Sequence, residues 1–254
     1  MVLQEVMGYD ITSMISKPKT SVNGSSNLPS TATPSKLIEK KIETSLDSTK
    51  FEHGWEAIGT HLIRNISAPQ VPGEKVKVAA FDLDGTLITT KSGVKFSKGP
   101  TDWKWWGNSL AKVPEAISKL CNSGYLIVIF TNQGAVVVNN NSKSYGNLKT
   151  KLNLVYAELS KFNVKSVYVY ASPKKPLKGP TSSEEQHKLM RKPEIGMWQD
   201  LESVLTDQGK AIDYKQSFFV GDAAGRKQDF LDSDLKFAEN AKIDFKTPEE
   251  FFND

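Results

Sequence analysis

Two aspartates in the first half of the chain, Asp82 and Asp84, have the types and the spacing that phosphoryl transfer needs. They lie in residues 81–86, which read FDLDGT. A carboxylate can attack phosphorus and form an aspartyl phosphate, which divides one difficult displacement into two easier ones. The second carboxylate can protonate the leaving oxygen and later activate water. Gly85 would permit a tight turn after the first acid, and the Thr86 hydroxyl could stabilise that turn.

Polar residues farther along the chain can complete such a site. Two acids beside a phosphate dianion repel it, so a cation is needed, and Mg²⁺ fits because it takes hard oxygen ligands. Asp222 is the natural third ligand for that ion. Thr131 can donate a hydrogen bond to a phosphoryl oxygen, and Lys192 can neutralise the charge that develops during the reaction.

These residues follow short apolar runs that we expect to be buried parallel strands. The strands are expected at residues 76–81, 126–130, 167–171 and 218–220, with helices beginning at Pro114 and Pro193 and another at 144–162. Strands that alternate with helices predict an α/β fold, a Rossmann-like doubly wound parallel sheet with helices on both faces. Because ligands bind beyond the carboxyl ends of such strands, we expect Asp82, Thr131 and Asp222 to share one crevice.

Composition sets limits on the rest of the chain. Its 254 residues suffice for one α/β domain and an extra segment, and the apolar fraction of 38% is low. Residues 16–50 are rich in Ser, Thr, Pro, Asn and Lys, so we expect residues 1–54 to be a largely disordered tail and residues 55–254 to be the domain. The single cysteine, Cys121, excludes a disulfide framework and a Cys-based zinc site, and we expect it to be a buried helix residue. We expect a soluble intracellular protein, because no run approaches the ~20 apolar residues of a membrane span.

The motifs resemble those of the haloacid-dehalogenase-like phosphohydrolases, and longer segments narrow the resemblance. The segments are FDLDGTLITTKSGVK at 81–95, GPTDW at 99–103, FTNQ at 130–133, RKP at 191–193 and GDAAGR at 221–226. Together they resemble the phosphatase domain of the polynucleotide kinase 3′-phosphatase family, from about residue 55 to the end. The chain looks like the stand-alone phosphatase of this family that is found in fungi.

The resemblance implies an enzyme that removes 3′-phosphate from DNA at nicks, gaps or breaks, on a fold with a small insert and no large cap. It implies Asp82 as nucleophile and Asp84 as general acid and base, with Thr131 and Lys192 binding the phosphoryl group. Mg²⁺ would be held by Asp82, Asp222 and the backbone carbonyl of Asp84. We further expect a set of polar residues to contact the substrate, namely Thr86, Ser92, Asn132, Gln133, Arg191 and Arg226. A monomer, a role in DNA repair and a nuclear location follow from this substrate as expectations.

The chain departs from the family pattern in three places. It has no G-x-x-x-x-G-K-[ST] segment, so we expect no 5′-kinase activity. Residues 134–141 read GAVVVNNN and lack the glycine- and arginine-containing pattern expected there. Arg226 and Lys227 stand where many superfamily members have an aspartate. Asp229 either serves the metal through water or caps a turn, and we favour the turn.

Residues 92–109 are the insert, which is too short for a large helical cap, so an open cleft that suits a polymer end is expected. Four cations lie in this insert or directly before it, namely Lys91, Lys95, Lys98 and Lys104, and they either meet DNA phosphates or are merely solvated. For Trp103, Trp105 and Trp106 we favour packing against the domain over stacking on DNA bases. We expect His61 and His187 to be surface residues.

Two alternatives remain, a phosphatase for a small phosphomonoester and a DNA-end-binding protein without turnover. The net charge of +4 suits a polyanionic partner without requiring one.

Overall fold

The computed structural model describes residues 49–67, 73–107, 109–139, 141–165, 167–229 and 231–253. Residues 1–48, which make up most of the expected tail, lie outside the described residues. Residues 49–53 are helical, and the ring of Phe51 stacks on Tyr156 with 4.1 Å between ring centroids. Phe51 is 3% exposed, so the packed core includes this first helical turn.

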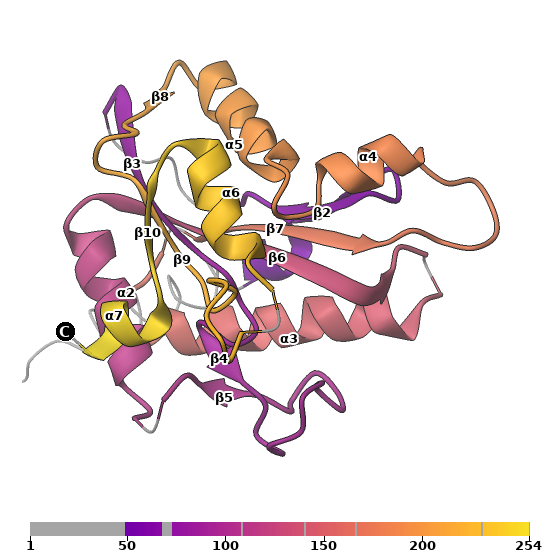
Figure 1. Ribbon diagram of the computed structural model, residues 1–254, viewed down its shortest axis with the longest axis horizontal. Coiled ribbons are helices and arrows are strands. Elements are labelled where there is room, and N and C mark those ends of the chain that lie inside the picture. The colour runs from indigo at the N-terminus through magenta and orange to yellow at the C-terminus, as the bar shows by residue number, and fades with distance from the viewer. Residues whose placement is uncertain are drawn as a thin grey trace, which may run out of the picture.

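Within the described residues, an eight-stranded sheet forms the centre of the fold (Figure 1). Its path runs β1 (Trp55–Ile58), β2 (Leu62–Asn65), β7 (Val167–Lys174), β6 (Tyr125–Val137), β3 (Lys75–Phe81), β9 (Phe218–Val220) and β10 (Asp244–Lys246), and β8 (Ala211–Ile212) also pairs with β3. Strands β7, β6, β3, β9 and β10 are parallel, which confirms the expected α/β sheet. The hairpin β1–β2 adds two antiparallel strands at one edge. It was not predicted because β1 is largely exposed and has no apolar run.

Helices cover both faces of the sheet, as expected for a doubly wound fold. They are α2 (Lys112–Asn122), α3 (Lys143–Ser160), α4 (Glu184–Leu189), α5 (Gly196–Asp207), α6 (Ser233–Ala241) and α7 (Pro248–Asn253). Side chains of α2, α3 and α7 pack into one apolar cluster, and those of α5 and α6 pack into the cluster on the opposite face. Figure 1 shows how these helices are arranged around the sheet. Among the described residues, no helix has the length and apolar character that crossing a membrane would need.

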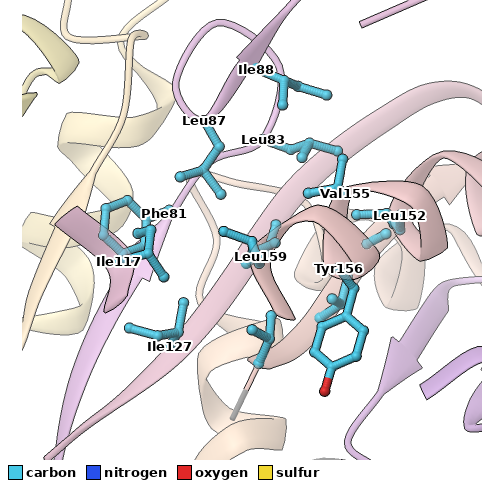
Figure 2. Packing of buried hydrophobic residues seen from close by; sticks show 14 of the residues in the cluster. Phe81, Leu83, Leu87, Ile88, Ile117, Ile127, Leu152, Val155, Tyr156 and Leu159 are labelled. Atoms are coloured by element: carbon cyan, nitrogen blue, oxygen red, sulfur yellow. The ribbon is translucent and has the colours of Figure 1, made fainter. Parts of the chain in front are cut away.

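Strand β6 separates the two apolar clusters because successive side chains of a strand point to opposite faces. Ile127 and Ile129 belong to the cluster under α2 and α3, and Val128 belongs to the other. Figure 2 shows Phe81 and Ile127 of the sheet among side chains of α2 and α3. Cys121 in α2 is only partly buried and packs at the edge of this cluster.

The two central strands β6 and β7 extend farther than the apolar runs predicted. Phe81, the last residue of β3, pairs with Ile129, whereas β6 continues through Thr131 to Val137. The ladder continues because β7 offers a partner for these polar residues as far as Gln133. Thr131 therefore lies within β6, two residues beyond the level at which β3 ends.

The insert after the first motif is a small hairpin without a helix. Strand β4 (Ile88–Thr89) pairs with β5 (Lys104–Trp105), and residues 90–103 form the loop between them. Trp105 is 6% exposed and lies 5.2 Å from the Trp103 ring, and Trp106 contacts the ring of Phe252. The expectation that the tryptophans pack against the domain is therefore confirmed.

The expectation that His61 and His187 are surface residues is wrong. They are 7% and 6% exposed, with ring centroids 6.2 Å apart, and burial lowers the pKa of both imidazoles. His61 Nδ1 lies 2.7 Å from the Ser182 hydroxyl, and His187 Nε2 lies 3.1 Å from the Thr60 hydroxyl. The β1–β2 turn folds against α4 and buries both rings, a long-range contact that no local pattern indicates.

A pair of leucines on α3 tests this packing. Leu152 is 1% exposed in the core, whereas Leu154 is 37% exposed on the same helix. We expect Leu152→Ala to lower the free energy of unfolding by ~2–5 kcal/mol, because it leaves a cavity under the sheet. Leu154→Ala should change it by about 0.5 kcal/mol or less. Urea unfolding followed by circular dichroism measures both, and equal losses would contradict this arrangement of α3.

Candidate active site

The carboxyl ends of three neighbouring strands bring the sequence-predicted residues together. Phe81 pairs with Ile129 of β6 and with Val220 of β9, so the residues that follow these positions lie at one edge of the sheet. The backbone N–H of Asp82 donates to the carbonyl of Val220 at 2.9 Å, which fixes the first acid beside Gly221. Asp82 is only 7% exposed.

Lys192 forms the strongest electrostatic contacts of the site. Its Nζ lies 2.6 Å from Oδ1 of Asp82 and 2.7 Å from Oδ1 of Asp234, and its side chain is 1% exposed. A tight turn in which Glu194 N–H donates to the Arg191 carbonyl carries the lysine to this position, so α5 begins only at Gly196 and not at Pro193 as predicted. Such short contacts between ionised groups are the strong form of hydrogen bond.

Asn132, which we expected to contact the substrate, holds the backbone of Lys192. Its Nδ2 donates to the Lys192 carbonyl at 3.0 Å, and its Oδ1 accepts from the Lys192 N–H at 3.0 Å. This two-way bond joins the end of β6 to the turn before α5. Asn132 therefore positions the cation, a role that its place after the second strand does not reveal.

Asp234 is the functional residue that sequence reasoning missed. It lies in the first turn of α6, is 2% exposed, and accepts a hydrogen bond from the Ala223 N–H at 3.0 Å. A Cβ at Gly221 would lie 2.5 Å from the Asp234 side chain, so only glycine leaves room for it. The available signal was an acid at the start of a helix after the fourth strand, which is too common to single out.

Oxygen atoms of Asp82, Asp222 and Asp234 lie within 4.8 Å of one another. Burial raises the pKa of Asp82 well above its usual range, the other two carboxylates raise it further, and Lys192 opposes them. Burial, followed by the charge of Asp234, raises the pKa of Asp222 to about 6. Burial alone would lower the pKa of Lys192, but Asp234 and Asp82 outweigh it and raise that pKa. When ionised, the three carboxylates exceed the single ammonium charge by two.

The excess negative charge and the oxygen donors of these three carboxylates fit Mg²⁺, which prefers oxygen ligands and octahedral geometry. Thr86 donates from its hydroxyl to Asp222 Oδ1 at 3.3 Å and so orients that acid, and its contact with the substrate stays a prediction. Gly85 has a φ of +97°, and a Cβ there would lie 2.5 Å from Asp222 Oδ2. The Asp84 carboxylate lies outside this acidic cluster, so only its backbone carbonyl remains for the metal role we predicted.

Asp84 differs from Asp82 in its exposure, because its side chain is 49% exposed. Gln133 Nε2 donates to Asp84 Oδ2 at 2.8 Å and to the Thr131 hydroxyl oxygen at 2.9 Å. Gln133 therefore fixes Asp84 relative to Thr131, the residue expected to bind phosphate. The expected contact of Gln133 with the substrate stays a prediction. Lys151 Nζ lies 3.5 Å from Asp84 Oδ1. The buried first acid and the more open second acid suit a nucleophile and a proton donor, respectively.

The donors of Arg226 hold the loop after β9, and its contact with the substrate stays a prediction. Its Nε donates to Asp229 Oδ2 at 2.8 Å, its Nη1 to Glu249 at 3.0 Å, and its Nη2 to the Asp222 carbonyl at 3.2 Å. Asp229 Oδ2 also accepts from the backbone N–H groups of Ala224 and Arg226, each at 3.0 Å. Asp229 therefore caps the turn, the alternative that we favoured.

Arg191 and Ser92 occupy different surroundings. Arg191 is exposed, and one of its guanidinium nitrogens would lie 3.3 Å from a Cβ built on Gly134. No carboxylate pairs with it among the residues that the structure describes. Ser92 lies in the insert loop, where its N–H and its hydroxyl both donate to the Asp102 carboxylate at 2.8 Å. Its predicted contact with the substrate stays a prediction.

The site can be compared with known proteins. The model of the family described as polynucleotide kinase 3 phosphatase matches residues 77–252. An uncharacterised 20.8 kDa protein of Autographa californica nuclear polyhedrosis virus is 37% identical over 186 residues, which are 70% of this chain and 86% of that protein. A polynucleotide 3′-phosphatase of Saccharomyces cerevisiae is 34% identical over 215 residues, with 70% and 88% covered.

A third relative is longer than this chain. A bifunctional polynucleotide phosphatase/kinase of Schizosaccharomyces pombe is 40% identical over 177 residues, which are 69% of this chain but 37% of that protein. Among solved structures, a HAD-like phosphatase from Mesorhizobium loti matches with a TM-score of 0.53 and 19% identity, covering 74% of this chain and 78% of that one. This likeness shows a fold of the HAD-like phosphatase type.

The pKa of Asp222 predicts how the metal-free protein responds to pH. The group has an ordinary pKa of 3.8 in the unfolded chain and about 6 in the folded one. The folded chain then binds more protons between these values, so its stability should fall as pH rises from about 4 to about 6, by up to roughly 3 kcal/mol.

Urea unfolding in EDTA of the wild type and Asp222→Asn isolates this contribution, since the variant has no carboxyl at this position. As pH rises through that interval, the free energy of unfolding should fall more for the wild type than for the variant. Added Mg²⁺ should raise the free energy of unfolding of the wild type more at pH 7 than at pH 5. A difference that stays constant with pH would contradict the raised pKa.

Proposed function

The chain belongs to the polynucleotide kinase 3 phosphatase family, and we propose that it removes 3′-phosphate from DNA ends through an aspartyl phosphate on Asp82. The observation that carries the proposal is the difference in burial between the two acids at the end of β3. Asp82 is buried against Lys192, whereas the side chain of Asp84 is half exposed. One acid is thus placed to attack and the other to transfer a proton.

In the first half of the reaction, a carboxylate oxygen of Asp82 attacks phosphorus. The bond between phosphorus and the 3′ oxygen breaks, and Asp84 gives its proton to that oxygen, which leaves as a 3′-hydroxyl. Lys192 binds Oδ1 of Asp82 at 2.6 Å, so we assign the attack to Oδ2. The Thr131 hydroxyl and the Lys192 ammonium stabilise charge that develops on the phosphoryl oxygens.

In the second half, water attacks phosphorus and the bond to the Asp82 oxygen breaks. Asp84 takes the proton from this water, which returns both acids to their starting states and releases inorganic phosphate. Gln133 keeps Asp84 aligned throughout, because it bonds Asp84 and Thr131 at the same time. Alignment of this kind makes the transfer effectively intramolecular.

We assign Mg²⁺ to Asp82, Asp222 and the backbone carbonyl of Asp84, where it would supply positive charge to the phosphate and the carboxylates. Asp234 lies in the same acidic cluster and pairs with Lys192 at 2.7 Å. It holds the lysine between two acids, so that the ammonium group remains charged at neutral pH. Arg226 supports the site indirectly by donating to the Asp222 carbonyl.

Two features favour a DNA end over a small phosphomonoester. The hairpin insert β4–β5 replaces a large cap, so a polymer can approach the site. The insert also has four exposed lysines, Lys91, Lys95, Lys98 and Lys104, and phosphates attract such groups without regard to base sequence. Exposed Arg191 beside Gly134 adds a cation near the loop that lacks the expected arginine pattern.

The wider role follows from this substrate. A 3′-hydroxyl is what polymerases and ligases need at a strand break, so we propose that the protein acts in DNA repair and in the nucleus. We expect this chain to have no 5′-kinase activity and to work as a monomer. A phosphatase for small phosphomonoesters, or a DNA-end binder without turnover, is the alternative that the following experiments would reveal.

The nucleophile is tested by Asp82→Asn, which keeps the shape of the side chain but removes the attacking carboxylate. We expect turnover of a 3′-phosphorylated oligonucleotide to fall on the order of 10³-fold or more, since no covalent intermediate can form. Asp244→Asn, on exposed β10, is the matched control and should keep the wild-type rate. Full turnover by Asp82→Asn would refute the mechanism.

End specificity is tested with one labelled oligonucleotide that carries phosphate at either its 3′ or its 5′ end. We expect release of the 3′-phosphate, little release from the 5′ end, and loss of activity in EDTA that Mg²⁺ restores. Equal rates at the two ends would rule out the proposed substrate. Binding to both ends without phosphate release would favour the non-enzymatic alternative.

A further inference from the structure

Lys151 is a buried cation for which the helical pattern gives no reason. It lies on α3 among the core positions Leu148, Leu152 and Val155, and it is 8% exposed. Burial of an ammonium group is costly unless an opposite charge or hydrogen bonds compensate it. A lysine on the core side of an amphipathic helix therefore needs a partner, and that partner identifies its role.

Its acidic partner within the described part of the chain is Asp84. Lys151 Nζ lies 3.5 Å from Asp84 Oδ1, while Gln133 Nε2 binds the other oxygen, Oδ2, at 2.8 Å. Each oxygen of the carboxylate thus has its own donor, one from α3 and one from β6. Two donors from different elements fix the orientation of a side chain that is otherwise 49% exposed.

The two buried lysines of the site differ in how tightly they are paired. Lys192 lies 2.6 and 2.7 Å from two carboxylates, whereas Lys151 has one contact at 3.5 Å. Charge-assisted hydrogen bonds are usually 2.7–2.9 Å long, so the charge of Lys151 is only partly satisfied. It can still respond to an increase of negative charge on Asp84.

We propose that Lys151 is a positioning residue for proton transfer by Asp84, an inference that rests on the function proposed above. When Asp84 gives its proton to the 3′ oxygen, a negative charge appears on the carboxylate beside the ammonium group. A fixed cation stabilises that charge more than the neutral acid that precedes it, which is the condition for faster chemistry. Lys151 then serves the leaving group, and Lys192 serves the nucleophile.

The experiment separates these two roles by the leaving group. The variants are Lys151→Met, Lys151→Arg and the control Lys161→Met, whose lysine directly follows α3 and pairs with Glu158. Two substrates are compared, a 3′-phosphorylated oligonucleotide, whose alkoxide must be protonated, and p-nitrophenyl phosphate, whose phenolate leaves without a proton. Rapid mixing measures the burst of p-nitrophenolate, which reports attack by Asp82 alone.

We expect Lys151→Met to lower kcat for the oligonucleotide roughly 10- to 100-fold, a part of what general acid catalysis contributes. Its burst rate with p-nitrophenyl phosphate should stay near that of the wild type. Lys151→Arg should recover most of the lost activity, since it restores the positive charge, and Lys161→Met should match the wild type with both substrates.

Two results would overturn the proposal. One is an equal fall with both substrates, which indicates a structural role, and the other is no fall with either. Thermal unfolding of each variant shows whether the fold is intact, and a variant that has lost its fold is replaced by Lys151→Gln. If the wild type gives a burst but releases no 3′-phosphate, the proposed function fails, and glycerol phosphate then replaces the oligonucleotide in the same comparison.

Discussion

The site depends on one buried ammonium group placed between two buried carboxylates. Lys192 lies 2.6 Å from Asp82 and 2.7 Å from Asp234, in surroundings that exclude nearly all water from its side chain. Removal of the lysine would leave two buried carboxylates without their cation, which is strongly destabilising. The lysine also holds the Asp82 carboxylate in place, so this contact links stability to the chemistry that we propose for Asp82.

Several structural features exist to hold this group. Asn132 clamps the backbone of Lys192 from the end of β6, and the N–H of Ala223 orients Asp234. Gly221 leaves space for Asp234 where any side chain would collide with it. These contacts come from β6, from the loop after β9 and from the start of α6, so the site needs the completed sheet and the helix α6 beside it.

The two acids after β3 have opposite surroundings although they are two residues apart. Asp82 turns toward Lys192 and the acidic cluster, whereas Asp84 turns toward Gln133 and Lys151 and remains half exposed. The glycine turn after Asp84 makes this possible, because Gly85 adopts a φ of +97° against Asp222. One short segment thereby supplies the proposed nucleophile and the proposed proton donor, each paired with a different lysine.

The sequence by itself determined the central parallel strands, the acids at their ends and the resemblance to a phosphatase family, because apolar runs and short motifs are local signals. It also indicated that the tryptophans of the insert pack against the domain. Only the tertiary structure decided the burial of His61, the place of Asp234 and the pairing of Lys151 with Asp84. It also showed that Asn132 bonds the backbone of Lys192 and that Gln133 bonds the side chains of Asp84 and Thr131. These features are contacts between segments far apart in the chain, so their geometry exists only once the sheet has formed.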